Sequence, residues 1–192
     1  VMNRIVQISI VLIAIALAAP AIADAEKGQH YGAYPPVQLA TVLETVGKKT
    51  GREFLTEDGV PSEIVVGQLQ AKDLTYSTLL IVLFNNNLAA VTVGDVTKIV
   101  DAARVRQHAL PIILEDNDAI DGYEWVTRVV EVRNTNAAQL VPILRPMVPQ
   151  MGHLVAHTGS NTLVIAARYD NAKRLAKIIS RIDSRATQPS GD

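Results

Sequence analysis

The stretch at residues 125–183 reads WVTRVVEVRNTNAAQLVPILRPMVPQMGHLVAHTGSNTLVIAARYDNAKRLAKIISRID and predicts one complete folding unit. It opens with a β-branched run that ends at Asn134, which favours a half-buried strand. Residues 134–136 then offer capping side chains ahead of a helical apolar stripe. The strand residues are Val126, Val129, Val130 and Val132, and the stripe residues are Ala137, Leu140, Val141 and Leu144. We expect the helix to end at Met151-Gly152, with a kink or a late start because Pro142 lacks a backbone donor.

The second half of the stretch predicts a hairpin and a closing helix. His153–His157 and Thr162–Ala166 are short apolar runs joined by a polar turn. Asp170 or Asn171 is expected to cap the last helix. Its inward-facing residues are Ala172, Leu175, Ile178, Ile179 and Ile182, and its outward-facing residues are Lys173, Arg174, Lys177 and Arg181. The predicted order is β-α-β-β-α, and we call residues 124–183 the second module.

Several linked motifs of this module resemble the N1-type periplasmic module of bacterial secretins. They are the helix start at Asn134–Leu140, Leu144–Met147 after it, the turn at Ser160–Leu163 and the closing Ile182-Asp183. Within that family the module is most similar to the type II secretion group, general secretion pathway protein D. The resemblance implies a compact KH-like βαββα fold.

The N-terminus has the pattern of a secretory signal peptide over residues 1–23. A short positive segment ends at Arg4, an apolar run covers Ile5–Ala19, and Ala21–Ala23 has the small-x-small pattern of a cleavage site. A membrane anchor is the alternative, but the run is shorter than the ~20 residues that a spanning helix needs. We therefore predict an exported, periplasmic protein.

Composition excludes some function classes and favours association. The 192 residues carry a net charge of −1, which does not favour nucleic acid as a partner. The chain has no cysteine, so no disulfide holds it together. Two cores of roughly 70 residues each are marginally stable, which favours self-association or a partner.

Residues 35–101 predict another small domain, the first module, after a disordered lead at 24–34. The predicted elements follow the order αββαββ, with Asp73 or Thr75 as the cap of the second helix. They are a helix at Val37–Thr50 ended by Gly51, strands at Arg52–Thr56 and Glu63–Val66, a helix ended by Asn85–Asn87, and a hairpin of Leu88–Val93 with Val96–Val100. This order resembles the N0-type domain of secretins, which also occurs on TonB-dependent receptors.

A linker is predicted at residues 102–123, because Pro111, the polar run Glu115–Asp118 and Gly122 lie there. Within it, Ile112–Leu114 could dock as an extra strand. Residues 184–192 are predicted to be a polar tail. The fold class is therefore α+β, with two small α/β modules.

No motif in the chain predicts catalysis, a cofactor or a metal site. His153 and His157 would bind one metal on a helix, but on a strand they lie ~13 Å apart. Asp116–Gly122 departs from a calcium loop, because Ile120 stands at a ligand position. P-loop, G-x-S-x-G and cysteine nucleophiles are absent from the sequence. A KH-type RNA site would need a G-x-x-G between helices, which is also missing.

The resemblance implies a non-catalytic periplasmic component of a protein secretion apparatus. Such modules stack into rings below an outer-membrane channel, with the first facing inner-membrane platform proteins or cargo and the second packing against copies of itself. The outer-membrane domain of a secretin is not in this sequence, so we expect either the N-terminal piece of a longer secretin or an accessory that joins its ring. Alternatives are a signalling module like that of TonB-dependent receptors, or a type IV pilus or type III secretin component.

The candidate self-association face combines basic and acidic flanks of the second module. Its residues are Lys173, Arg174, Lys177, Arg181, Glu131 and Asp170. Glu124, Glu131 and Asp170 are expected on elements other than the basic helix, so opposite charges would allow a head-to-tail contact that closes into a ring. The alternative is a solvated helix face whose charges contribute little.

Overall fold

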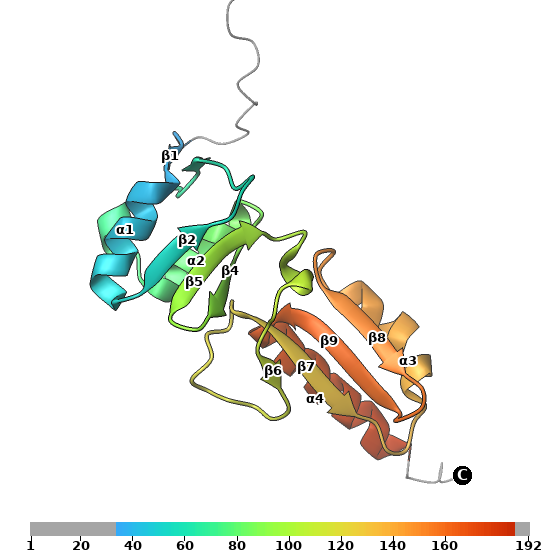
Figure 1. Ribbon diagram of the computed structural model, residues 1–192. Coiled ribbons are helices and arrows are strands. Elements are labelled where there is room, and N and C mark those ends of the chain that lie inside the picture. Colours follow the sequence, from blue (N-terminus) through green and yellow to red (C-terminus); the bar gives the residue numbers. More distant parts are fainter. Residues whose placement is uncertain (1–33, 187–192) are drawn as a thin grey trace, which may run out of the picture. The chain divides into compact units, whose positions relative to one another are not determined.

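The computed structural model describes residues 34–186, which lie within one compact unit (Figure 1). The predicted signal peptide, nearly all of the predicted lead and most of the predicted tail lie outside the described residues. The described chain mixes helices with three small sheets, so the predicted α+β class is confirmed. Within residues 34–186, no helix has the length and apolar character needed to cross a membrane.

The first module forms a three-stranded sheet, a two-stranded ribbon and two α-helices. Its elements are β1 (Val37–Gln38), α1 (Leu39–Thr50), β2 (Glu53–Thr56), β3 (Glu63–Ile64), the 3-10 turn η1 (Ala71–Asp73), α2 (Tyr76–Asn85), β4 (Leu88–Val93) and β5 (Val96–Asp101). In the sheet, of order β2-β5-β4, β5 pairs in parallel with β2 and antiparallel with β4. The predicted helix start at Val37 is wrong, because Val37 and Gln38 pair with β3 as a short extra strand.

Local signals set the helix ends of the first module. Gly51 ends α1 in the left-handed conformation, φ 69°, and its N–H donates to the Gly47 carbonyl at 2.8 Å. Thr75 caps α2, because its hydroxyl accepts from the Thr78 amide at 3.2 Å. Of the two predicted caps Thr75 is therefore correct, and Asp73 lies in η1 instead.

The second module has a four-stranded sheet of order β6-β7-β9-β8. The elements after β5 are η2 (Val105–Gln107), β6 (Ile112–Ile113), β7 (Trp125–Glu131), α3 (Ala137–Leu144), η3 (Arg145–Met147), β8 (His153–His157), β9 (Thr162–Arg168) and α4 (Tyr169–Arg185). β9 pairs antiparallel with both β7 and β8, as the predicted hairpin requires. The predicted extra strand is confirmed, since β6 pairs in parallel with β7.

The first helix of this module differs from the prediction at its C-terminal end. α3 begins at Ala137, directly after the predicted capping residues, and the Asn136 side chain accepts from the Ala138 amide at 2.9 Å. The late start predicted as one effect of Pro142 is therefore wrong, because Pro142 lies inside the helix. Its predicted continuation to Met151 is wrong, because the chain passes into η3 after Leu144, where Pro146 cannot donate a helical hydrogen bond.

The predicted side-chain cap of α4 is also wrong. Neither Asp170 nor Asn171 caps the helix, which begins at Tyr169 without a side-chain cap. Instead, the amides of Tyr169 and Asp170 donate to the carbonyls of Glu124 (2.8 Å) and Gly122 (3.0 Å). At its other end α4 continues to Arg185, two residues into the predicted tail.

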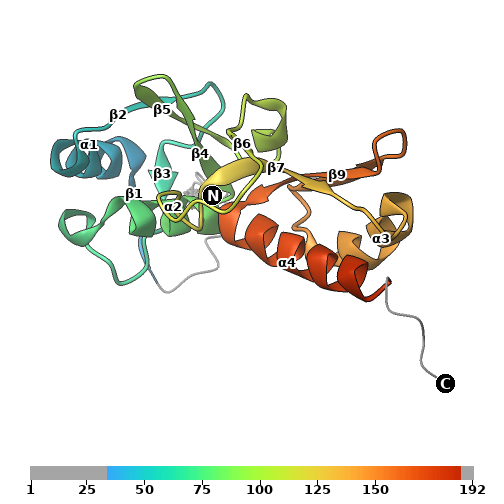
Figure 2. The same ribbon diagram turned by 90° about the horizontal axis from the view of Figure 1, so that it is seen from below.

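In the second module, α3 and α4 cover the same face of the sheet, and Figure 2 shows both helices below β7 and β9. Apolar side chains of both helices and of the strands fill the space between them. The fully buried members include Val126, Ala137, Leu163, Ala167, Ala172, Leu175 and Ile179. This packing leaves the opposite face of β7, β9 and β8 free of any helix of its own module.

A third apolar cluster joins the two modules. Trp125 and Ala166 of the second sheet pack with residues from β4, β5 and the segment after β5. The buried members are Ala89, Val91, Val100, Ala102, Val105, Leu110, Trp125 and Ala166. The Arg168 guanidinium also lies 4.1 Å from the ring centroid of Phe84 and 4.5 Å from that of Tyr123. Part of the predicted linker is thus packed, while the division into independent domains stays a prediction.

Candidate interaction surface

The basic residues predicted on the closing helix lie on α4, but they differ in their partners. Lys173 Nζ lies 3.0 Å from Asp118 Oδ1 and 3.9 Å from Asp116 Oδ2. The hydrogen bond to Asp118 raises the pKa of the lysine. Arg174 donates to the Met147 carbonyl at 3.3 Å. The side chains of Lys173 and Arg174 therefore already bind groups of the same chain.

Lys177 and Arg181 form the free part of the basic face. Both side chains are exposed, one helical turn apart on α4, and neither makes a hydrogen bond or an ion pair within residues 34–186. Because residues four apart share one side of a helix, their charges point the same way. They are the pair in α4 that is best placed to meet an external anion.

A groove of about 400 Å³ runs beside this pair. Its lining residues are Asp116, Arg128, Ala176, Lys177, Ser180, Arg181 and Ser184. The small residues of α4 recur every four positions, which leaves space between the helix and β7. Arg128 is only 8% exposed, its Nη1 lies 3.1 Å from Asp116 Oδ1, and its buried Nε makes no hydrogen bond. The groove therefore holds three cationic side chains and one carboxylate.

The structure separates the acidic residues that were predicted to complement the basic face. Glu131 is exposed at the end of β7, opposite Thr162 of β9. Asp170 lies in the first turn of α4 itself, so its predicted place on another element is wrong. Glu124 is half-buried, and burial raises its pKa against the opposing effects of a hydrogen bond from Tyr76 and the charge of Arg52. Of these three carboxylates, Glu131 is the accessible one on a flank other than α4.

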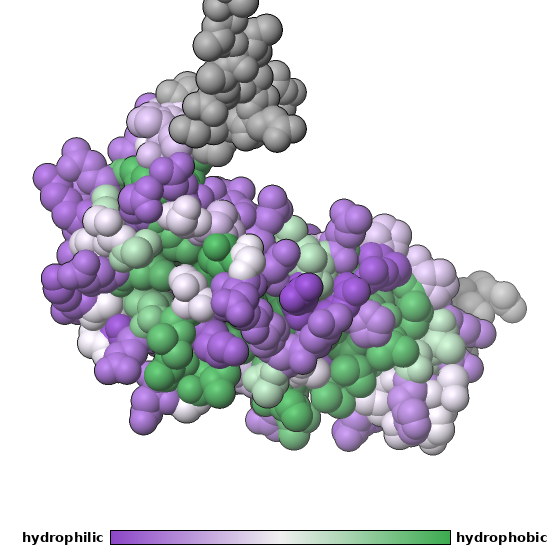
Figure 3. Space-filling model, turned by 45° about the horizontal axis from the view of Figure 1, so that its top comes forward, coloured by the Kyte–Doolittle hydropathy of each residue, from purple (hydrophilic) through white to green (hydrophobic). Residues whose placement is uncertain are grey.

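The open face of the second sheet carries a row of valines that was not predicted as a contact surface. Val129 pairs with Val164, and Val164 pairs with Val155, which is 44% exposed. Figure 3 shows hydrophobic surface among hydrophilic side chains on the right-hand side of the molecule. The sequence feature that could have predicted this row is the period-2 alternation within the strands. Alternate side chains of a strand point to opposite faces, so one set of valines must face away from the helices. This row is a candidate contact surface.

His153 and His157 flank the same open face at the two ends of β8. His157 Nδ1 lies 2.8 Å from the Ser160 hydroxyl, in the turn that follows the strand. Within residues 34–186, no group of three or more potential ligand side chains is placed to hold a metal ion.

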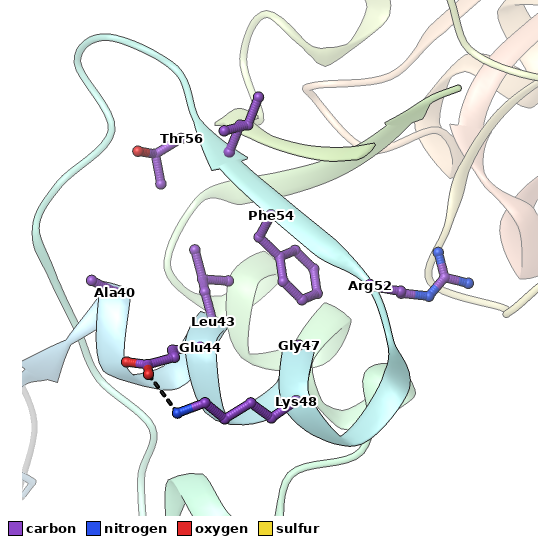
Figure 4. Close-up of a pocket in the computed structure, with 9 residues that line it drawn as sticks. Ala40, Leu43, Glu44, Gly47, Lys48, Arg52, Phe54 and Thr56 are labelled. Atoms are coloured by element: carbon purple, nitrogen blue, oxygen red, sulfur yellow. Dashed lines mark hydrogen bonds and ion pairs between the residues drawn. The ribbon is translucent and has the colours of Figure 1, made fainter. Parts of the chain in front are cut away.

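A second groove, of about 490 Å³, lies in the first module between α1 and β2 (Figure 4). Phe54 and Leu43 supply apolar lining, and the Lys48–Glu44 ion pair of 2.6 Å lies along its outer side. A Cβ on Gly47 would lie 2.9 Å from the Arg52 carbonyl, so glycine permits this close approach of α1 and β2. Leu55 is 57% exposed, and β2 pairs only with β5 among the described strands. The groove thus adjoins an unpaired strand edge.

Asp183 fixes the end of α4 against the rest of the second module. Its carboxylate accepts from the amides of Arg133 (2.9 Å), Asn134 (2.8 Å) and Thr135 (2.8 Å). Burial raises the pKa of Asp183, but these backbone donors outweigh it and the pKa is lowered. The carboxylate thereby holds the loop after β7 against the last turn of α4, close to Arg181.

Comparison with known protein families matches residues 127–188 to the bacterial type II/III secretion system short domain. This match covers most of the second module, including β7, α3, the hairpin and α4. The predicted resemblance to secretins is therefore confirmed.

Similarity to individual secretins extends into the first module. Secretin GspD 2 of Escherichia coli O78:H11 is 29% identical over 164 residues, which are 83% of this chain and 24% of the relative. Secretin ExeD of Aeromonas hydrophila is 30% identical over 165 residues, again 83% of this chain and 24% of the relative. The chain thus spans about a quarter of the length of these relatives.

A solved secretin assembly has the same fold over most of the chain. It is the Klebsiella pneumoniae type II secretion system outer membrane complex with PulD, PulS and the PulC HR domain. The similarity has a TM-score of 0.63 and 27% identity, and it covers 78% of this chain and 26% of the solved chain. The secretin short domain and the module before it therefore occur together in a known secretion complex.

Proposed function

We propose that this chain is the N-terminal periplasmic region of a type II secretion secretin, with a non-catalytic role in protein export across the outer membrane. The observation that carries the proposal is the secretin short domain at residues 127–188, embedded in a longer similarity to type II secretins. The shared fold with a type II outer membrane complex supports the same role.

The second module would act by side-to-side self-association. Its valine row occupies one face of the sheet, and Lys177 and Arg181 lie on the helix that covers the other face. Two different surfaces of one module favour a heterologous contact, which closes into a ring when the rotation between copies permits. Each contact is small, but a ring forms many of them at once, so weak contacts add up.

The first module would bind a partner from the inner-membrane side of the apparatus or the secreted cargo. The groove beside β2 and its unpaired strand edge support this assignment, because a free edge accepts an added strand through backbone hydrogen bonds. A solved complex of the relative PulD also contains PulS and the PulC HR domain, so a related secretin is known in an assembly with other proteins.

The test is to replace the matching region of E. coli Secretin GspD 2 with this chain and to measure high-mass multimers and secretion. We expect multimers at a yield close to that of the parent secretin and above that of a version lacking the region. A replacement that inserts and folds but never multimerises would reject the ring-forming role. Secretion without a platform interaction would instead reject the role of the first module.

A further inference from the structure

The groove between α4 and β7 combines features of a built anion site. Arg128 is nine-tenths buried and lines the groove, and its Nε makes no hydrogen bond. A buried guanidinium with an unbonded donor is costly unless a further acceptor completes its coordination. Lys177 and Arg181 line the same groove from the solvent side. The cationic groups therefore converge on one opening rather than spreading over the surface.

The charge within the groove is only partly neutralised. Asp116 is 3.1 Å from Arg128 Nη1, but it also lies 3.9 Å from Lys173. One carboxylate thus faces two cations of its own copy, while Lys177 and Arg181 have no acidic partner within residues 34–186. An arginine and a lysine on such a rim bind a carboxylate by charge-assisted hydrogen bonds.

We propose that this groove is a carboxylate-binding site and that its ligand is Glu131 of a second copy. The proposal rests on the proposed function, because it names the contact that holds neighbouring copies together. Glu131 is exposed at the end of β7, and its side chain makes no ion pair or hydrogen bond within the described chain. It lies beside the valine row, in register with Thr162 and His157.

Other acidic groups of the second module fit this role less well. Asp116 and Asp118 are engaged with Arg128 and Lys173. Glu124 is half-buried against Tyr76, and Asp170 lies on α4 itself. Glu115 directly precedes Asp116, so it lies on the flank of the groove and not opposite to it. Glu131 of a copy that presents its open sheet face to α4 therefore completes the site.

The test uses charge exchange in the assembled secretin that carries this chain. Arg181→Glu and Glu131→Lys are each expected to lower the yield of high-mass multimers about tenfold, because each places like charges at the contact. Arg174→Glu and Glu53→Lys are matched controls with the same charge changes outside the groove, and they should leave the yield near that of the unchanged chain. Melting temperatures of all variants show whether the modules still fold.

Co-expression of the two single variants then decides whether the contact joins different copies. In a ring where the two variants alternate, the glutamate introduced by Arg181→Glu in one copy faces the lysine introduced by Glu131→Lys in the next. The following contact is the original pair of arginine and glutamate, so multimers should return.

The double variant, with Arg181→Glu and Glu131→Lys in the same chain, should also recover. Recovery of the double variant without recovery of the mixture, or equal loss in the controls, overturns the site. Absence of multimers from the unchanged chain instead rejects the proposed function and the site with it.

Discussion

Replacing Asp183 tests whether one carboxylate holds the second module together at the end of α4. In Asp183→Asn the amide oxygen can still accept from Asn134 and Thr135, but its NH₂ group faces the Arg133 amide instead of accepting from it. A hydrogen bond to a charged acceptor contributes about 1.5–3 kcal/mol, so the free energy of unfolding should fall by about 2–3 kcal/mol. For a unit of this size that lowers the melting temperature by about 4–12 °C.

The matched control is Asp118→Asn, which makes the same chemical change at an exposed ion pair with Lys173. A solvent-screened surface pair of this kind contributes little to stability, so the melting temperature of this variant should change little. Urea unfolding followed by circular dichroism measures both losses.

The effect of Asp183 also has a defined pH dependence. Its folded-state pKa is lowered, so its contribution is fully present above the pKa of the unfolded chain, about 3.9. As the pH falls from that value through the folded-state pKa, the contribution is lost. The stability difference between the unchanged protein and Asp183→Asn should therefore be constant near neutrality and shrink in acid below about pH 4. Two results would refute the reasoning. One is an equal loss of stability in Asp183→Asn and Asp118→Asn, and the other is a stability difference between the unchanged protein and Asp183→Asn that persists in acid.

Three further outcomes are expected. Gly152→Ala should destabilise the second module by about 1–3 kcal/mol, because a Cβ there would lie 2.7 Å from the Ala166 carbonyl; an unchanged melting temperature contradicts this. Limited proteolysis should cut at the exposed residues 115–119 and leave two resistant pieces, which gel filtration should find still associated through the cluster around Trp125. Mass spectrometry of exported protein should find a mature chain that begins near Asp24, and an intact Ile5–Ala19 segment would reject the signal peptide.

Sequence patterns predicted those elements whose signals are local. The cap at Asn136, the cap at Thr75 and the left-handed Gly51 depend on a residue and its near neighbours. The strands of the second module follow from β-branched runs, and their pairing follows from one short turn. The secretin resemblance rested on motifs within these same elements, which is why it could be recognised.

Other features depend on residues that are distant in the chain. The start of α4 is closed by carbonyls of residues 122 and 124, about fifty positions earlier, so no local cap signal existed. Glu124 looked like a surface acid, but the fold half-buries it against Tyr76 of the first module. Arg128 interrupts an apolar run, and only the packing of α4 shows that it lines a groove. The charge pattern therefore predicted the basic helix, but it did not predict the groove beside that helix or the contacts of its side chains.

The apolar cluster around Trp125 makes the two sheets mechanically coupled. Trp125 begins β7, and Ala166 lies in β9, so the strands that carry the valine row are anchored directly under β4 and β5. In the proposed ring, a load applied to the first sheet by a bound partner would pass through these buried side chains to the strands that carry the valine row. Separating the two sheets would expose the Trp125 indole to water, so rotation of one module relative to the other costs free energy. The two modules would then move together as one rigid body, and a displacement of the first module would also displace the second.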